Sequence, residues 1–387
     1  MVNSSELQDV QPQHARTDVR YLLDLSARGL PQMFDETTGM FCNKLKKSAR
    51  GLAPEGVSPR YTAMTLMGLH RLEQNGVPST LGVRPAVERF LANTNWVDNI
   101  GDLGLMLWLG ARVAPDLIGE LERHFQIPTA LERLETTREG NTMHLSWFLT
   151  GLSCLAQVSN HPGAVGDVAR KTYNLLMQNQ GKHGYFGHLA ARRSLRGRLR
   201  GQIGSFADQV YPIYGMTQFF QAFGDESALS RARDCALAIC QAQGPLGQWW
   251  WHYHSGNGRV FEEYPVYSVH QHGMAPMALF ALSKASGESF DSWIYKGLGW
   301  LDKRNELSVN MVDSSASVIW RCIRPSTLKR FSGALLGAGR KVQDPAGLSV
   351  LFECWPYELG WLLYGLADLL SKPVSLARPI DATSSVV

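Results

Sequence analysis

The stretch of the chain richest in groups that can move protons or stack on a ring is residues 248–274, QWWWHYHSGNGRVFEEYPVYSVHQHGM. It holds three consecutive tryptophans, four histidines, three tyrosines and the adjacent pair Glu262 and Glu263. Carboxyl, phenol and imidazole groups can act as general acids, bases or nucleophiles, and glycoside hydrolysis uses paired carboxyls. The stretch is therefore interpreted either as a catalytic wall or as a packed junction between helices.

Spacing separates the histidines of this stretch. Tyr267, His270, Gln271 and Met274 recur at intervals of three and four, which places them on one face of a predicted helix. His272 points elsewhere, so His270 is the preferred candidate. Acidic residues before a helix, such as Glu262 and Glu263, are in many cases only partners of the helix dipole.

The elements that must position these groups are helices almost throughout. Apolar residues recur at helical spacing in one segment after another. The predicted helices are 17–29, 59–72, 83–94, 100–113, 115–135, 142–158, 164–180, 206–223, 226–243, 265–285, 287–303 and 354–371. Helices rich in Gly, Met, Leu and aromatic residues alternate with more charged, amphipathic ones. Six buried helices inside six amphipathic helices define an all-α fold, the (α/α)6 toroid, around a central cavity.

Two internal repeats support this fold. Pro-x-Tyr is predicted to open buried helices at Pro59, Pro212 and Pro265, with a shortened copy at Pro356, because proline suits the first helical turn. The second repeat places a glutamine, a glycine turn and an aromatic residue after an outer helix, in LLMQNQGKHGYF and AICQAQGPLGQWW, with a looser copy in LPQMFDETTGMF. The aromatic residue, Phe186 or Trp249, is interpreted as a structural plug beside the turn.

This second repeat resembles the QW repeats of squalene and terpene cyclases. It also resembles the hairpin turns of six-hairpin glycosidases such as the unsaturated glucuronyl hydrolases. Both groups share the (α/α)6 toroid, so the resemblance implies a fold more than a reaction.

In such toroids the inner-helix N-termini usually form the mouth of the cavity, so residues near these starts are the site candidates. The candidates for catalysis are Glu262, Glu263, His270, Tyr267, Asp208 and Glu353. The candidates for substrate binding are Tyr61, Arg60, Asp102, His144, Tyr211, Tyr214, Trp250, His252, His254, Trp355, Tyr357 and Glu358. His252 and His254 alternate with aromatic residues before a Ser-Gly-Asn-Gly turn, which predicts a hairpin that carries both on one face. No third ligand completes a metal site there, and no cofactor is expected.

A run of five arginines, RRSLRGRLR, precedes the helix predicted at 206. It is interpreted as a solvated loop or as an anion clamp at the mouth, because guanidinium groups bind phosphate and carboxylate in a bidentate manner. A uronate, a nucleotide sugar, a lipid diphosphate and an acidic membrane surface are the alternative ligands. The arginines are Arg192, Arg193, Arg196, Arg198 and Arg200.

Three functions fit these features. The first is a glycan-active enzyme, either a hydrolase, or a lyase or epimerase that acts on a uronic-acid-containing saccharide. A lyase or epimerase abstracts a proton beside a carboxylate, and this mechanism favours Tyr267 and His270 as bases. The alternative is a terpene cyclase or prenyl-transfer enzyme, although the chain has no DxDD motif. The third is a non-catalytic glycan-binding toroid.

Composition bounds these alternatives. The chain has 387 residues, 44% of them hydrophobic and 19% charged, with a net charge of +4 that does not indicate nucleic-acid binding. It has no apolar run long enough to span a membrane and no signal-peptide pattern, which predicts a cytoplasmic protein. The six scattered cysteines are expected to be buried free thiols. The predicted organisation is a tail at 1–16, one domain at 17–375 with an irregular insertion at 305–350, and a tail at 376–387.

Overall fold

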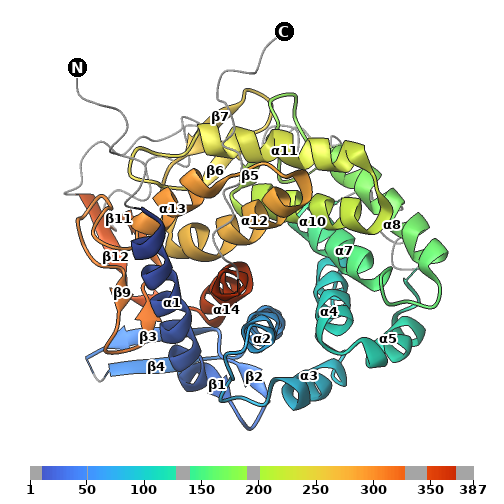
Figure 1. Cartoon of the computed structure of the whole chain (residues 1–387), viewed down its shortest axis with the longest axis horizontal. Coiled ribbons are helices and arrows are strands. Elements are labelled where there is room, and N and C mark those ends of the chain that lie inside the picture. The colour runs from blue at the N-terminus through green and yellow to red at the C-terminus, as the bar shows by residue number, and fades with distance from the viewer. Residues whose placement is uncertain (1–10, 50, 128–139, 190–200, 327–346, 372–387) are drawn as a thin grey trace.

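The computed structural model describes residues 11–49, 51–127, 140–189, 201–326 and 347–371. Within these residues, outer and inner helices alternate along the chain (Figure 1). The outer helices are α1 (Gln11–Gly29), α3 (Val83–Leu91), α5 (Ile118–Phe125), α8 (Pro162–Met177), α11 (Glu226–Gln241) and α13 (Asp291–Gly299). The inner helices are α2 (Pro59–Gln74), α4 (Ile100–Val113), α7 (Thr142–Leu155), α10 (Ala207–Phe223), α12 (Ala275–Ser286) and α14 (Pro356–Leu366). This arrangement confirms the predicted (α/α)6 toroid.

The inner helices form a closed ring, because α14 packs against α2 as well as against α12. Two glycine pairs let neighbouring helices approach at backbone distance. A Cβ at Gly68 of α2 would overlap the carbonyl of Gly360 in α14, and a Cβ at Gly151 of α7 would overlap the carbonyl of Gly104 in α4. At these two contacts the helix backbones can approach closely because glycine has no side chain.

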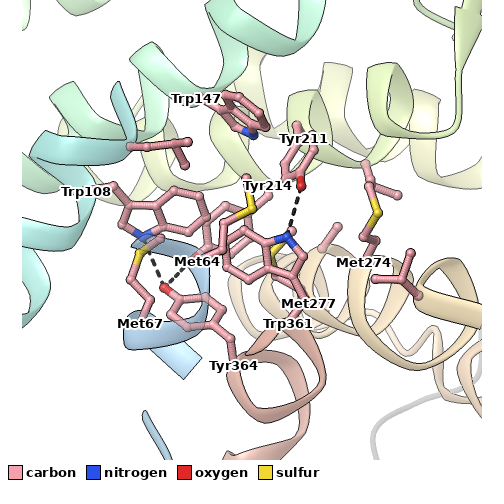
Figure 2. Close-up of a cluster of buried hydrophobic side chains, with 14 of the residues drawn as sticks. Met64, Met67, Trp108, Trp147, Tyr211, Tyr214, Met274, Met277, Trp361 and Tyr364 are labelled. Carbon is pink, nitrogen blue, oxygen red and sulfur yellow. Dashed lines mark hydrogen bonds between the residues drawn. The ribbon is translucent and has the colours of Figure 1, made fainter. Parts of the chain in front are cut away.

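Large buried side chains from all six inner helices fill the middle of this ring (Figure 2). Trp108 Nε1 donates to the Tyr364 hydroxyl at 3.2 Å, and the hydroxyls of Tyr364 and Tyr214 lie 2.8 Å apart. Trp361 Nε1 donates to the Tyr211 hydroxyl at 3.0 Å. We call this group the axial plug; its labelled members are Met64, Met67, Trp108, Trp147, Tyr211, Tyr214, Met274, Met277, Trp361 and Tyr364. The axis that the sequence predicted as an open cavity is closed at this level.

The glutamine repeat has the structural role that the sequence predicted. Gln180 Nε2 donates to the carbonyls of Gly184, in its own turn, and Arg231, in the next outer helix. Gln243 Nε2 does the same with the carbonyls of Gly247 and Trp293. Each glutamine thus ties a glycine turn to the following outer helix, while Phe186 and Trp249 are fully buried behind the turns.

Short strands connect the helices at one end of the ring. One sheet joins β5 (Ile203–Ser205), β6 (His252–His254) and β7 (Arg259–Glu262). A second joins β12 (Leu348–Leu351), β11 (Cys322–Pro325) and β8 (Val266–Tyr267). A third joins β13 (Glu353–Cys354), β3 (Lys44–Ser48) and β4 (Gly51–Glu55). Two two-stranded sheets pair β1 (Phe34–Asp35) with β2 (Met40–Phe41) and β9 (Val312–Asp313) with β10 (Val318–Ile319).

The Pro-x-Tyr prediction is wrong at two of its positions. Pro59 and Pro356 do open α2 and α14, but Pro212 lies inside α10. Pro265 follows a cis peptide bond and precedes strand β8, and the helix begins only at Ser268, before a π-helical turn at His270–Met274. The common face expected for Tyr267 and His270 on one helix therefore does not exist, although their rings lie 5.2 Å apart.

Other expectations are adjusted by the structure. Helix α1 begins at Gln11, inside the stretch predicted as a tail. The insertion predicted at 305–350 contributes strands β9 to β12, and its residues 327–346 lie outside the described residues. All six cysteines are buried and free, as predicted.

Replacing Gly68 with alanine tests the ring-closing contact. The added methyl group meets the Gly360 carbonyl, so we expect G68A to lower the free energy of unfolding by about 1–3 kcal/mol. Chemical denaturation measures this change. Gly163 of α8 has nothing within 4 Å of its added Cβ, so G163A is the matched control and should be neutral or slightly stabilising. Equal stability of G68A and G163A would contradict the close contact.

Candidate functional site

The N-terminal ends of α2, α4, α7 and α10 bring a row of ionisable side chains together. We call Arg60, Asp102, His144, His188 and Asp208 the polar arc. Asp102, which is 1% exposed, accepts from Arg60 Nε at 2.5 Å and from Arg60 Nη2 at 3.2 Å. It also accepts from Asn99 Nδ2 at 2.8 Å. This many donors hold the Asp102 carboxylate in one orientation and stabilise its charge.

Asp208, at the start of α10, forms the other end of the arc. Its Oδ2 accepts from the Ser205 N–H at 2.9 Å and the Ser205 hydroxyl at 3.0 Å, and it lies 3.1 Å from His188 Nδ1. Its Oδ1 is buried and has no hydrogen-bond partner in the described part of the chain. The His188 side chain is 44% exposed, whereas that of Asp208 is 2% exposed. The buried carboxyl thus supports a ring that solvent reaches.

His144 lies between the two carboxyls. Burial lowers the pKa of His144, and so does the Arg60 guanidinium, while Asp102 and Asp208 oppose this decrease. Gly101 sits directly under the imidazole, where a Cβ would meet the ring. The imidazole is therefore neutral near neutral pH and can accept a hydrogen bond as well as donate one.

Aromatic rings complete the circle of helix starts. We call Trp251, Tyr267, His270, Trp355, Tyr357 and Tyr61, with Arg321 and Glu358, the aromatic arc. Tyr61 stacks on Tyr357 with 4.7 Å between ring centroids. The guanidinium of Arg321 lies over Trp355 at 3.3 Å from the ring centroid and over Tyr267 at 4.9 Å. The β11–β8 pairing, which sets Cys322 opposite Tyr267, brings Arg321 to this position.

Arg321 and Glu358 form a buried ion pair within this arc. Arg321 Nη1 donates to Glu358 Oε1 at 2.5 Å, and the Trp355 N–H donates to Glu358 Oε2 at 3.2 Å. Burial raises the pKa of the Glu358 carboxyl, and the guanidinium opposes that rise. The pair neutralises a charge that would be costly to bury alone.

The two arcs meet at both ends. On α2, Arg60 belongs to the polar arc and its neighbour Tyr61 to the aromatic arc. At the start of α10, Phe206 packs on His270 with 4.5 Å between ring centroids, two residues before Asp208. Acid–base groups and ring faces therefore surround one end of the toroid, which we call the N-terminal rim.

The structure distributes the predicted site residues over several places. Arg60, Asp102, His144 and Asp208 lie in the polar arc, and Tyr61, Tyr267, His270, Trp355, Tyr357 and Glu358 lie in the aromatic arc. Tyr211 and Tyr214 are buried in the axial plug below the rim. The five arginines of the run at 192–200 lie outside the described residues.

The remaining candidates have local partners. His252 Nδ1 lies 2.8 Å from Glu262 Oε2 across the β6–β7 hairpin, which the sequence predicted. His254 Nδ1 accepts the Gly256 N–H of the turn at 3.1 Å, and Trp250 Nε1 donates to the Ala242 carbonyl at 2.7 Å.

Two predicted carboxylates lie on or next to the strands beside the rim. Glu353 Oε1 accepts from Lys44 Nζ at 2.9 Å, and its Oε2 accepts from Trp355 Nε1 at 3.2 Å. Burial alone would raise the pKa of Glu353, but these two donors together outweigh burial. The net pKa is lowered, so the group stays ionised. Glu263 follows strand β7, and its carbonyl accepts the Trp251 N–H at 3.2 Å.

Sequence reasoning missed His188 and Arg321 as members of the rim. His188 follows the glutamine repeat in HGYFGHL, and Arg321 lies in the segment interpreted as an insertion. Only the returning loop and the β11–β8 register bring them to the helix starts. No group of three or more potential metal ligands occurs among the described residues, and no described helix is long and apolar enough to cross a membrane.

Comparison with solved structures shows the same fold in glycosidases. An unsaturated glucuronyl hydrolase specific for heparin superposes with a TM-score of 0.57 and 15% identity, over 92% of this chain and 98% of that one. A possible member of the GH105 family from Salmonella enterica serovar Paratyphi A gives a TM-score of 0.61 and 12% identity, over 96% and 99%. An inactive variant of the alpha-1,6-mannanase GH76A of Salegentibacter, in complex with alpha-1,6-mannotetrose, gives 0.56 and 13%, over 91% and 99%.

These structures are six-hairpin (α/α)6 glycosidases, and this chain has their fold over nearly its whole length. No family model and no curated protein sequence matches the chain.

Two buried histidines, His270 of the rim and its neighbour His272, make stability depend on pH. Burial lowers the pKa of His270 and of His272 to about 3, below the value of 6.5 for an unperturbed ring. The unfolded chain therefore binds more protons below pH 6.5, so stability is complete above that pH and is lost as the pH falls toward 3. At about pH 5 we expect each histidine to cost about 2 kcal/mol.

Denaturation at about pH 7 and pH 5 measures this effect. His272, whose ring nitrogens have no partner among the described residues, is replaced in H272L, which should lose less stability on acidification than the wild type. The exposed His124 provides the control H124Q, which should behave like the wild type. An unchanged pH dependence in H272L would contradict a buried neutral ring.

Proposed function

We propose that the protein is a glycan-active enzyme that hydrolyses an oligosaccharide at the N-terminal rim. The observation that carries this proposal is the closed circle of two arcs, which sets two buried carboxyls opposite a wall of aromatic rings. Aromatic faces stack on pyranose rings, and hydrolysis of a glycosidic bond needs carboxyls around an oxocarbenium-like transition state. The glycosidases that share the fold support the same function.

The two carboxyls have different environments and therefore different roles. Asp102 is held by Arg60 and Asn99, so its fixed negative charge suits stabilisation of positive charge that develops on the sugar. Asp208 has three donors around Oδ2 and none at Oδ1. We assign proton transfer to Asp208 through Oδ1, which passes a proton between the attacking water and the sugar. Because Oδ1 is covered, a local movement of rim side chains must expose it.

The partly exposed cation of the rim supports one substrate class over others. Arg60 bonds to Asp102 through Nε and Nη2, and its side chain is 40% exposed. A partly exposed guanidinium can bind a ligand carboxylate, which supports a uronic-acid-containing saccharide. The linkage of the substrate to a lipid or phosphate rests on the arginine run alone and stays a prediction from the sequence.

Hydrolysis is favoured over elimination or epimerisation by the state of the phenols. Burial raises the pKa of Tyr61 and of Tyr267 to about 12, although Arg321 opposes this rise in both. A phenol with a raised pKa is a poorer source of phenolate at neutral pH. Burial also makes His270 a very weak base. Tyr267 and His270, which the sequence predicted to abstract a proton beside a carboxylate, are thus less suited to proton transfer than the carboxyls of the polar arc. An aromatic cavity for an isoprenoid has less support, because the axial plug occupies the axis.

Substitution of Asp208 tests this function. The wild type is incubated with unsaturated uronyl oligosaccharides and with manno-oligosaccharides in water enriched in oxygen-18, and the products are examined by mass spectrometry. Hydrolysis incorporates one labelled oxygen for each bond cleaved. D208N keeps the shape of the side chain but cannot carry the proton, so we expect activity to fall by roughly 10²–10⁴-fold.

Asp225 supplies the control. It accepts the Ala228 N–H as the cap of the outer helix α11, and asparagine can do the same, so D225N should retain full activity. Cleavage that survives D208N would contradict the role of Asp208. Absence of both binding and turnover for every saccharide would contradict the function itself.

A further inference from the structure

Asn141, the residue that caps α7, has its side-chain amide fixed in one orientation. Its Oδ1 accepts the Met143 N–H at 2.9 Å and the His144 N–H at 3.4 Å, as an N-cap residue does. Because these two atoms are donors, the oxygen must face the helix and the NH2 group must face away from it. The two backbone donors therefore determine which end of the Asn141 amide is the oxygen and which is the nitrogen.

The amide nitrogen determines which nitrogen of His188 carries a proton. Asn141 Nδ2 lies 2.9 Å from His188 Nε2. Since Nδ2 can only donate, Nε2 must present its lone pair. The proton of a neutral His188 is then on Nδ1, where it is donated to Asp208 Oδ2 at 3.1 Å. Asn141, His188 and Asp208 thus form a chain of hydrogen bonds with one direction, from the α7 cap to the α10 carboxyl.

The backbone of His188 is held by the same helix start. The Thr142 N–H donates to the His188 carbonyl at 3.0 Å, and the Thr142 hydroxyl donates to the Gly187 carbonyl at 2.5 Å. Asn179 Nδ2 in turn donates to Thr142 Oγ1 at 2.8 Å. The first turn of α7 therefore fixes both the main chain and the ring of His188.

We infer that Asn141 is a positioning residue that sets the tautomer of His188 and, through it, the oxygen with which Asp208 works. With Oδ2 receiving the Nδ1 proton and the two Ser205 donors, Oδ1 is the oxygen left to exchange a proton or contact a substrate. A His188 with its proton on Nε2 would instead compete with Asn141 and leave Oδ2 without one of its donors. The link to catalysis rests on the proposed function, whereas the tautomer does not.

The charged groups around His188 and its contact with Asn141 act in opposite directions on the protonation of the ring. The titratable groups that face the ring include Asp208 on α10 and His144 on α7, and His144 also lies near Arg60 and Asp102. The Asp208 carboxylate favours a positively charged ring. A donor to Nε2 disfavours it, and so does the positive end of the α7 dipole. Removing the donor should therefore tip the balance towards protonation.

Nitrogen-15 NMR of the histidine rings in the full-length protein tests this inference without substrate. The wild type should show His188 protonated at Nδ1 and unprotonated at Nε2 near neutral pH. N141S keeps a capping oxygen but removes the donor, so the titration midpoint of His188 should move to higher pH. N141D also keeps the cap and places a carboxylate beside Nε2. It should raise the protonation constant further, by about tenfold or more over the wild type.

Asn99 offers a matched control on the neighbouring helix. It caps α4 in the same way, through Oδ1 to the Gly101 N–H at 2.9 Å, but its Nδ2 donates to Asp102 at 2.8 Å. N99S therefore removes an equivalent amide donor without touching His188, and it should leave the His188 titration unchanged. A wild-type His188 protonated at Nε2, or a titration that neither N141S nor N141D moves, would overturn the inference. If the tautomer is as stated but no saccharide is turned over, the proposed function fails while the positioning role stands.

Discussion

The packing of the last inner helix against the first is the contact on which the rest of the toroid depends. Where α14 meets α2, Gly68 faces the backbone of Gly360, so the helix axes approach without intervening side chains. Residues nearly three hundred positions apart thereby become neighbours. Tyr61 can stack on Tyr357 only because this contact is made, and the aromatic arc joins the polar arc through the first turn of α2.

The helix caps at the N-terminal rim serve the backbone and the site at once. Asn99 and Asn141 each use their carbonyl oxygen to satisfy N–H groups of the first helical turn. Each then directs its amide nitrogen toward an ionisable neighbour, Asp102 in one case and His188 in the other. A residue that starts a helix thus also orients a chemical group, which limits the conformational freedom of the rim side chains.

Local patterns were sufficient to predict the fold, whereas the site depends on contacts that they do not encode. Apolar periodicity located the inner helices, because each is buried along its length, and the glutamine repeat marked the turns. The same reasoning misassigned Pro265, since a proline after a cis bond resembles one at a helix start. It grouped Asp102, His144 and Asp208 because all lie at helix starts. Sequence reasoning did not find His188 and Arg321, because a returning loop places the first and the register between two strands places the second.

The axial plug determines the side from which a molecule can reach the rim. Buried side chains from every inner helix close the axis below the rim, so the described part of the toroid offers no passage from one face to the other. A molecule that binds at the rim must leave by the face through which it arrived. A polymer cannot be threaded through the ring. A polymer that binds and one that is released must therefore use the same opening at the rim.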